Sequence, residues 1–141
     1  MRHTKLDQNQ YCLILEPNEE IINSLTNFCN IQQINNASFT AIGAVDKVAI
    51  GVFDKTHKKY NNFNLSGDLE IVSLIGNVVL KEHKPFVHAH IVISDENCIC
   101  KGGHLISGHI SLTCEIFITT YEKTIKREPD SSLGIATINF K

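Results

Sequence analysis

Residues 86–94 read Phe-Val-His-Ala-His-Ile-Val-Ile-Ser, an alternation that is typical of a β-strand with one buried face. The odd positions are all apolar and predict the side that packs on a core: Val87, Ala89, Ile91 and Ile93. His88 and His90 lie on the other side, because residues i and i+2 of a strand point the same way. Neutral imidazole is a common metal ligand, so this strand predicts two ligands that share one space.

A second strand is expected to return beside the first and to bring a third imidazole, His104. Asp95-Glu96-Asn97 suits a three-residue loop with its Asn in the left-handed conformation. That loop pairs His104 with His88 and leaves room beside His90, opposite Gly102, so the three histidines converge on one face. A loop one residue shorter or longer would turn His104 to the opposite side, and a bulge at the glycine pair before it would also change the register.

The rest of the chain predicts mostly strand, over residues 11–16, 37–54, 60–65, 69–81 and 108–121, with bends or bulges at Gly43 and Gly51. One helix is expected, with Asn18 as its N-cap. Its core stripe is Ile21, Ile22, Leu25, Phe28 and Cys29. Short loops between consecutive strands favour an antiparallel sheet, hence an α+β fold in a single domain over residues 1–141.

Two of these strands carry apolar faces that we expect to be buried. In 69–81 the face consists of Val72, Leu74, Val78 and Leu80. In 108–121 it consists of Ile110, Leu112, Cys114, Ile116 and Ile118, and Glu115 falls on the polar side. Glu115 is therefore a candidate to support a metal ligand or to act as a general base, although a solvent-facing carboxylate is the simpler interpretation.

Composition limits the classes of function. The net charge of −2 gives no electrostatic argument for nucleic acid, and the absence of tryptophan argues against a base-stacking platform. The short basic clusters, at residues 58–59, 123 and 126–127, are expected to be solvated surface. No apolar leader or membrane-spanning stretch is present, and five cysteines without a C-x-x-C motif suit free thiols in a reducing cytoplasm. Cys98 and Cys100 either lend a ligand to the histidines or are buried as small hydrophobes.

Several motifs along the chain carry a resemblance to a known family. They are Leu69-Glu-Ile-Val-Ser-Leu-Ile-Gly76, Pro85-Phe-Val-His-Ala-His90, Ser94-Asp95 and Gly102-Gly103-His104-Leu105, with Arg127, Asp130, Leu133 and Gly134 near the end. Together they resemble the PPC domain (plant and prokaryote conserved domain) over nearly the whole chain. The resemblance implies an antiparallel sheet with flanking helices, assembled as a homotrimer. Single-domain prokaryotic members carry the description "predicted DNA-binding protein".

The resemblance also implies a metal ion, commonly zinc, on the histidines of its two motifs. Carried over, these ligands are His88, His90 and His104. Further matching positions are Ser94, Asp95, Gly102 and Gly103, of which the first two could support the ligands and the glycines would be structural. Plant members place the domain after AT-hook segments, and no Arg-Gly-Arg motif of that kind occurs here.

Two functions of different classes follow as hypotheses. The first is a trimeric binding or regulatory module that carries the metal and contacts DNA. The second is a metal-dependent enzyme that acts on a small molecule at His88, His90 and His104, since three imidazoles leave one metal position exchangeable. A purely structural metal in the trimer is a third interpretation, under which loss of the metal lowers stability alone.

Overall fold

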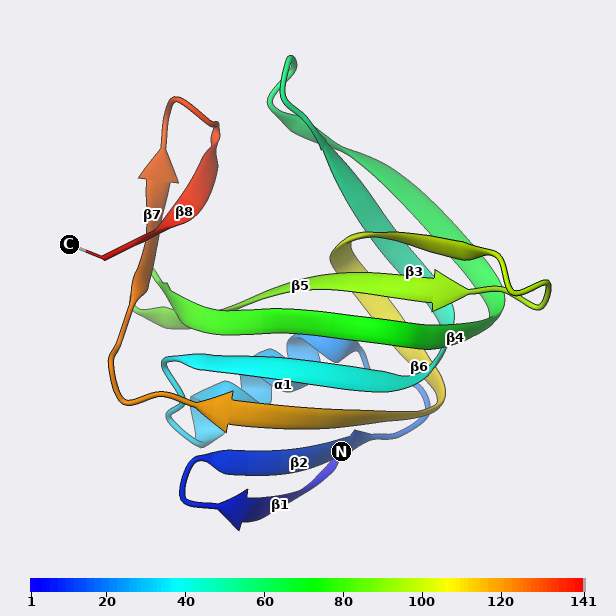
Figure 1. Ribbon diagram of the computed structural model, residues 1–141, viewed down its shortest axis with the longest axis horizontal. Coiled ribbons are helices and arrows are strands. Elements are labelled where there is room, and N and C mark those ends of the chain that lie inside the picture. The colour runs from blue at the N-terminus through cyan, green and yellow to red at the C-terminus, as the bar shows by residue number, and fades with distance from the viewer. Residues whose placement is uncertain (141) are drawn as a thin grey trace.

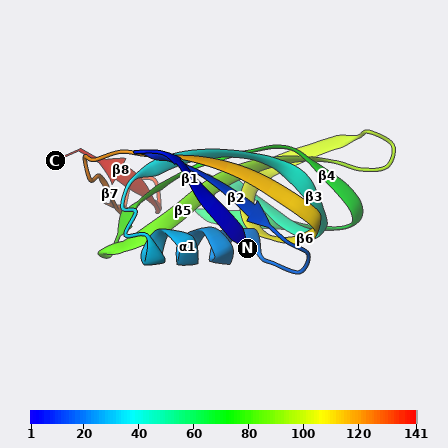
Figure 2. The same cartoon turned by 90° about the horizontal axis from the view of Figure 1, so that it is seen from below.

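A single eight-stranded sheet with one helix on one of its faces makes up the protein (Figures 1 and 2). The computed structural model describes residues 1–140. The elements, in chain order, are β1 (Arg2–Asp7), β2 (Gln10–Leu15), α1 (Ile21–Ile31), β3 (Ala37–Asp54), β4 (Lys59–Lys81), β5 (Lys84–Ser94), β6 (Cys100–Thr120), β7 (Lys126–Asp130) and β8 (Ile135–Asn139). The sheet confirms the expected β-rich architecture, but residues 1–140 contain one helix instead of the several that the family resemblance implied.

The order of strands in the sheet is β1-β2-β6-β3-β4-β7-β8, and β5 pairs with both β4 and β6. All pairs are antiparallel except one parallel bridge, between Leu80 of β4 and Lys126 of β7. Because the long strand β6 pairs with β5 at its start and with β3 along most of its length, the strands β3, β4, β5 and β6 close on one another. This closure places the start of β6 between β5 and the far end of β3.

The helix begins two residues later than the Asn18 cap predicted. Glu20 is the N-cap, and its carboxylate accepts hydrogen bonds from the backbone N–H groups of Ile22 (3.2 Å) and Asn23 (2.7 Å). The same carboxylate accepts from Gly108 N–H (3.1 Å) and so ties the helix to β6. Asn18 instead has a left-handed φ of 72° and donates its N–H to the carbonyl of Ile110.

The core lies between α1 and one face of the sheet. The predicted helical stripe is confirmed for its four buried members, and Ile22 packs against their edge. The four odd positions of β5 are all buried as well, at 7% exposure or less. Figure 2 shows α1 beneath this face, whereas the opposite face carries no helix within residues 1–140.

β-Bulges break the two long apolar faces that the alternation predicted. Residues 60–65 and 69–81 belong to one continuous strand, β4, in which the pairing with β5 shifts between Ile71 and Ser73. Val72 is the extra residue, so it turns outward (51% exposed) and leaves Ile71 and Leu74 buried. A shift in β6 opposite Gly43–Val45 likewise leaves Leu112 70% exposed.

Of the two glycines predicted to bend a strand, Gly43 lies at an irregularity of the sheet and Gly51 does not. Gly43 lies at the register shifts of β3 with both of its neighbouring strands, as expected. Gly51 pairs regularly with Asn62 and His104, so no bend is needed there.

The first strand, β1, was not predicted, because its sequence alternates poorly and all six residues are exposed. No helix within residues 1–140 is long and apolar enough to cross a bilayer.

Candidate metal centre

The β5–β6 hairpin carries all three predicted histidines, but its loop is longer than the sequence suggested. Ser94 pairs with Cys100, so the loop covers residues 95–99, and His104 faces His90 instead of His88. The expected register was therefore wrong by two residues. A shift of two preserves the face of every side chain in a strand, whereas a shift of one would have reversed it. The convergence of the histidines survives for this reason.

Local hydrogen bonds explain the longer loop. The Asp95 carboxylate accepts from the backbone N–H groups of Asn97 (2.9 Å) and Ile99 (3.0 Å), which makes an Asx-type turn. The left-handed residue is Cys98, with φ of 60°, and not Asn97. Cys98 and Cys100 are both exposed, which excludes the buried interpretation, and neither belongs to the histidine cluster.

Glycines allow three strands to approach closely beside the histidines. A Cβ at Gly103 would lie 2.8 Å from the carbonyl oxygen of Gly51 on β3, and a Cβ at Gly102 would lie 2.8 Å from that of Ile91 on β5. Any side chain at these positions would force β6 away from its neighbours. The Gly-Gly-His motif thus places His104 at the point where β3, β5 and β6 meet.

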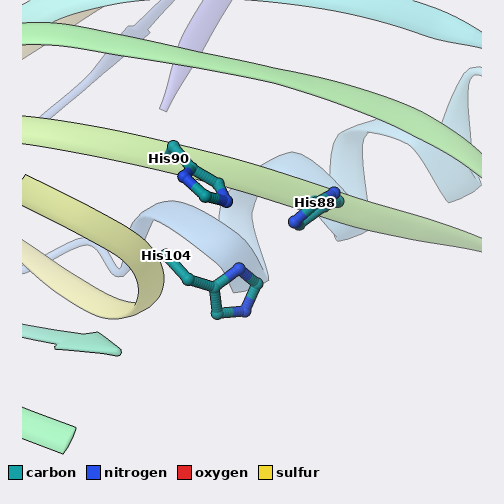
Figure 3. Close-up of side chains that lie close together, drawn as sticks. All are labelled: His88, His90 and His104. Carbon is teal, nitrogen blue, oxygen red and sulfur yellow. The ribbon is translucent and has the colours of Figure 1, made fainter. Parts of the chain in front are cut away.

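The three imidazoles point toward one another from β5 and β6 (Figure 3). Ring centroids are 5.3 Å apart for His88 and His90, 5.0 Å for His88 and His104, and 5.6 Å for His90 and His104. One nitrogen from each ring lies within 4.8 Å of the other two, a spacing that can hold one metal ion. Tyr60 of β4 stacks on His104, with centroids 4.8 Å apart, and fixes the plane of that ring.

The environment favours the neutral form of two of these imidazoles, those of His88 and His104. Burial lowers the pKa of His88 to about 4, with help from the positive charge of Arg127 and from the other two histidines. Burial also lowers the pKa of His104, and His90 and Arg127 add to the effect. A neutral imidazole offers a lone pair to a metal ion, whereas a protonated one does not. His88 and His104 are therefore held in the form that can bind a cation.

Arg127 is a charged neighbour of the histidines that the sequence interpretation missed, as it missed Tyr60. The basic pair 126–127 was expected to be solvated, but the Arg127 guanidinium is half-buried and its Nη2 lies 2.7 Å from Nδ1 of His88. Nη1 donates to the carbonyl of Ala136 (3.0 Å), and the guanidinium carbon lies 5.8 Å from the centre of the Phe86 ring. The only signal in the sequence was the match of Arg127 to a family motif.

Unsatisfied polar atoms gather at this same place. Among the described residues, three buried side-chain nitrogen or oxygen atoms have no hydrogen-bond partner: Asn77 Oδ1, His104 Nδ1 and Arg127 Nε. Asn77 pairs with His88 across β4 and β5, so all three belong to the histidine site. Such an atom costs about 1–3 kcal/mol when left unpaired. Their concentration here, around three imidazoles, fits a site that is completed by a metal ion and its remaining ligands.

Three residues were proposed from the sequence to support the metal ligands: Ser94, Asp95 and Glu115. Their hydrogen bonds and strand pairings lie elsewhere. The Ser94 hydroxyl donates to the carbonyl of Asp95, whose own carboxylate serves the loop. Glu115 pairs with Ile14 and Ile42 and lines a separate hollow with Phe117. No hydrogen bond within residues 1–140 joins any of these three carboxyl or hydroxyl groups to a histidine of the cluster.

Comparisons with known proteins agree on one family. The model of the Plants and Prokaryotes Conserved (PCC) domain matches residues 2–122. No curated protein matches the chain. Among solved structures, a plant- and prokaryote-conserved (PPC) protein from Pyrococcus horikoshii is 37% identical, with a TM-score of 0.85 over 90% of this chain and 88% of that one.

Two further solved structures are similar over almost the full length. A metal-containing protein from Archaeoglobus fulgidus is 30% identical, with a TM-score of 0.85 over 95% of this chain and 98% of that one. A candidate DNA-binding protein from Bacteroides thetaiotaomicron is 25% identical, with a TM-score of 0.95 over 99% of this chain and 96% of that one. The family match ends at residue 122, before the β7–β8 hairpin that supplies Arg127.

Proposed function

This chain belongs to the PCC (PPC) domain family, and from that premise we propose that it is a self-associating, single-domain module that binds a divalent transition metal through His88, His90 and His104. The observation that carries the proposal is the cluster itself. Three imidazoles from two strands each offer a nitrogen within 4.8 Å of the others, and the unpaired buried atoms lie among or next to them.

Zinc is the metal that the donor set fits best. Three histidines with a remaining exchangeable position are one of the established ligand sets of catalytic zinc. Imidazole sites also accept copper, nickel and iron, whereas magnesium prefers oxygen ligands. The similarity to a protein described as metal-containing supports the assignment. When bound, the metal would supply Lewis acidity at its open position.

The location that we propose is the cytoplasm. The five unpaired cysteines accord with its reducing conditions.

Stability measurements test the metal. A ligand that binds only the folded state, at about 100 times its dissociation constant, adds about 2.7 kcal/mol to the free energy of unfolding. We expect Zn²⁺ to raise the urea midpoint of the untagged protein and Mg²⁺ to leave it unchanged. His90→Ala should abolish the response to Zn²⁺, because His90 is exposed and its loss removes a ligand without opening the core. An equal response in His90→Ala would contradict the proposal.

Self-association is supported by the face of the sheet opposite α1, and the homotrimeric state that we propose for it follows the family resemblance. Large apolar side chains are exposed there around one hollow: Ile42 (58%), Val72 (51%), Ile75 (55%) and Phe117 (53%). Exposed apolar patches of this kind mark interfaces. Ile75 pairs with His90, so the patch extends to the histidine site.

Light scattering coupled to gel filtration tests the assembly. We expect the mass of three chains for the protein and the mass of one for Phe117→Glu, which places a charge within the patch. Ile31→Glu is the matched control, because Ile31 is 74% exposed on the helix and lies away from the patch. A Phe117→Glu variant that keeps the full mass would rule out this face as the interface.

DNA binding is the second candidate function, favoured by the similarity to a candidate DNA-binding protein. The net charge of −2 opposes it, because affinity for phosphates comes from Lys and Arg and falls steeply with salt. Fluorescence anisotropy with a labelled DNA duplex tests this second function. Binding at low salt that weakens as salt increases would support the DNA function, and no binding at about 50 mM salt would refute it.

A further inference from the structure

The contact between Arg127 and His88 is unusual for a metal ligand. A histidine that binds a metal normally donates its other N–H to a carboxylate, a carbonyl or water. His88 instead meets a guanidinium, which has donors and no acceptor. Arg127 therefore donates to Nδ1, and in this state the proton of the neutral His88 imidazole lies on Nε2.

Metal binding and this hydrogen bond exclude each other, since a neutral imidazole has only one lone pair. If His88 bound the metal through Nδ1, the Arg127 guanidinium would occupy the position of the metal. If His88 bound through Nε2, the proton would move to Nδ1 and would face a second donor. In either case Nη2 of Arg127 must leave His88 when the metal arrives.

The released guanidinium would still be held beside the site. Its Nη1 is anchored on the carbonyl of Ala136, and the ring of Phe86 lies beneath it. Within residues 1–140 no carboxylate forms an ion pair with Arg127, and its Nε is buried without a partner. A divalent cation and an unpaired guanidinium side by side repel each other unless an anion lies between them.

Apolar side chains next to His104 indicate the kind of anion. The hollow beside this histidine is lined by Ile22, Tyr60, Phe86 and Ile106, among others. It lies next to Arg127 through Phe86, whose ring also contacts the guanidinium. The guanidinium fork matches a carboxylate in geometry, and the apolar wall suits a hydrocarbon body. Resting on the proposed metal site, we propose that the pocket binds a small organic acid whose carboxylate would pair with the released Arg127 guanidinium beside the metal.

Cobalt and butyrate are the probes for a test on the full chain. Co²⁺ binding is followed by its visible absorption, with and without butyrate, at an ionic strength held constant with chloride. In the unaltered protein we expect butyrate to tighten Co²⁺ binding about tenfold, which is a typical coupling between two ligands, and to change the absorption spectrum. Arg127→Gln should bind Co²⁺ at least as tightly without butyrate and should lose the coupling.

Two further variants make the result specific. Lys126→Gln removes the same charge from the exposed neighbouring residue and should keep the full coupling. Arg127→Lys keeps the charge without the planar fork and should show a weaker coupling between butyrate and Co²⁺. This variant also allows the coupling to be measured if Arg127→Gln does not fold. Acetate should couple more weakly than butyrate because it lacks most of the apolar body.

The outcomes separate this inference from the proposed function. If the unaltered protein binds no Co²⁺, the metal site itself fails. If Co²⁺ binds but butyrate changes neither affinity nor spectrum, the metal site stands and the organic acid is ruled out. If inorganic phosphate couples as strongly as butyrate, the assignment to an organic acid is overturned.

Discussion

Acid should destabilise the metal-free protein through the two histidines whose pKa is lowered by folding, His88 and His104. The contribution of His88 can be isolated, because the lowered pKa of His104 comes from burial, His90 and Arg127 and is kept when His88 is replaced. The pKa of His88 lies near 4 in the folded protein, mainly because the ring is buried, and returns to about 6.5 on unfolding. Between these values the unfolded chain binds the extra proton, so the free energy of unfolding increases with pH. The contribution of His88 is fully present above about pH 6.5 and is lost as the pH falls toward 4.

The size of this effect follows from the difference between the two pKa values of His88. At about 1.4 kcal/mol for each pH unit, a pKa near 4 in place of 6.5 corresponds to a ceiling of roughly 3 kcal/mol. The ring is only half-buried, so solvent screens part of its interaction with Arg127 and the other histidines. We therefore expect a loss of about 1–2 kcal/mol between pH 7 and pH 4.5.

Urea unfolding in EDTA, at fixed chain concentration, measures this loss across the pH range. His88→Gln should lose about 1–2 kcal/mol less than the unaltered protein over the same interval. His109→Gln, a change at an exposed histidine, should behave as the unaltered protein does. Carboxylates with lowered pKa, such as Asp54 and Asp130, act at lower pH and equally in all three proteins. Identical pH profiles for His88→Gln and the unaltered protein would refute the reasoning.

Two further changes test the supports of the site by urea unfolding. Glu20→Ala leaves three backbone N–H groups without their acceptor, two in the helix and that of Gly108, and should lower the free energy of unfolding by about 2–3 kcal/mol. Glu20→Gln keeps one acceptor oxygen and should cost less; an equal cost would contradict the capping account. Gly76→Ala forces a methyl group against the ring of Phe39 and the carbonyl of His88, and should cost about 1–3 kcal/mol and weaken Zn²⁺ binding. An unaltered urea midpoint for Gly76→Ala would show that β4 and β5 separate there freely.

Local alternation was enough to predict most strands and the meeting of the three histidines. The period of a strand is two residues, so the face of His88 and His90 follows from their spacing alone. The partner of His104 depended on the length of one loop, which was set by the Asp95 carboxylate rather than by a standard three-residue turn. The error was an even number of residues, so the three histidines still converge although the register differs from the expected one.

Features that depend on contacts between distant segments could not be predicted. Val72 and Leu112 belong to apolar patterns, yet bulges imposed by the neighbouring strands turn both toward the surface. Arg127 lies 39 residues after His88 and reaches it only because β7 joins the edge of β4 through the bridge at Leu80. A local pattern carries no information on such pairing, and a Lys-Arg pair is usually solvated.

Metal stoichiometry in single-histidine variants tests the central claim most directly. The untagged protein is dialysed to equilibrium against Zn²⁺ and the bound metal is counted per chain. We predict one Zn²⁺ per chain for the unaltered protein and for His109→Ala, and none retained at the same free Zn²⁺ by His88→Ala, His90→Ala or His104→Ala. One Zn²⁺ per chain in all three of these variants would contradict the three-histidine site.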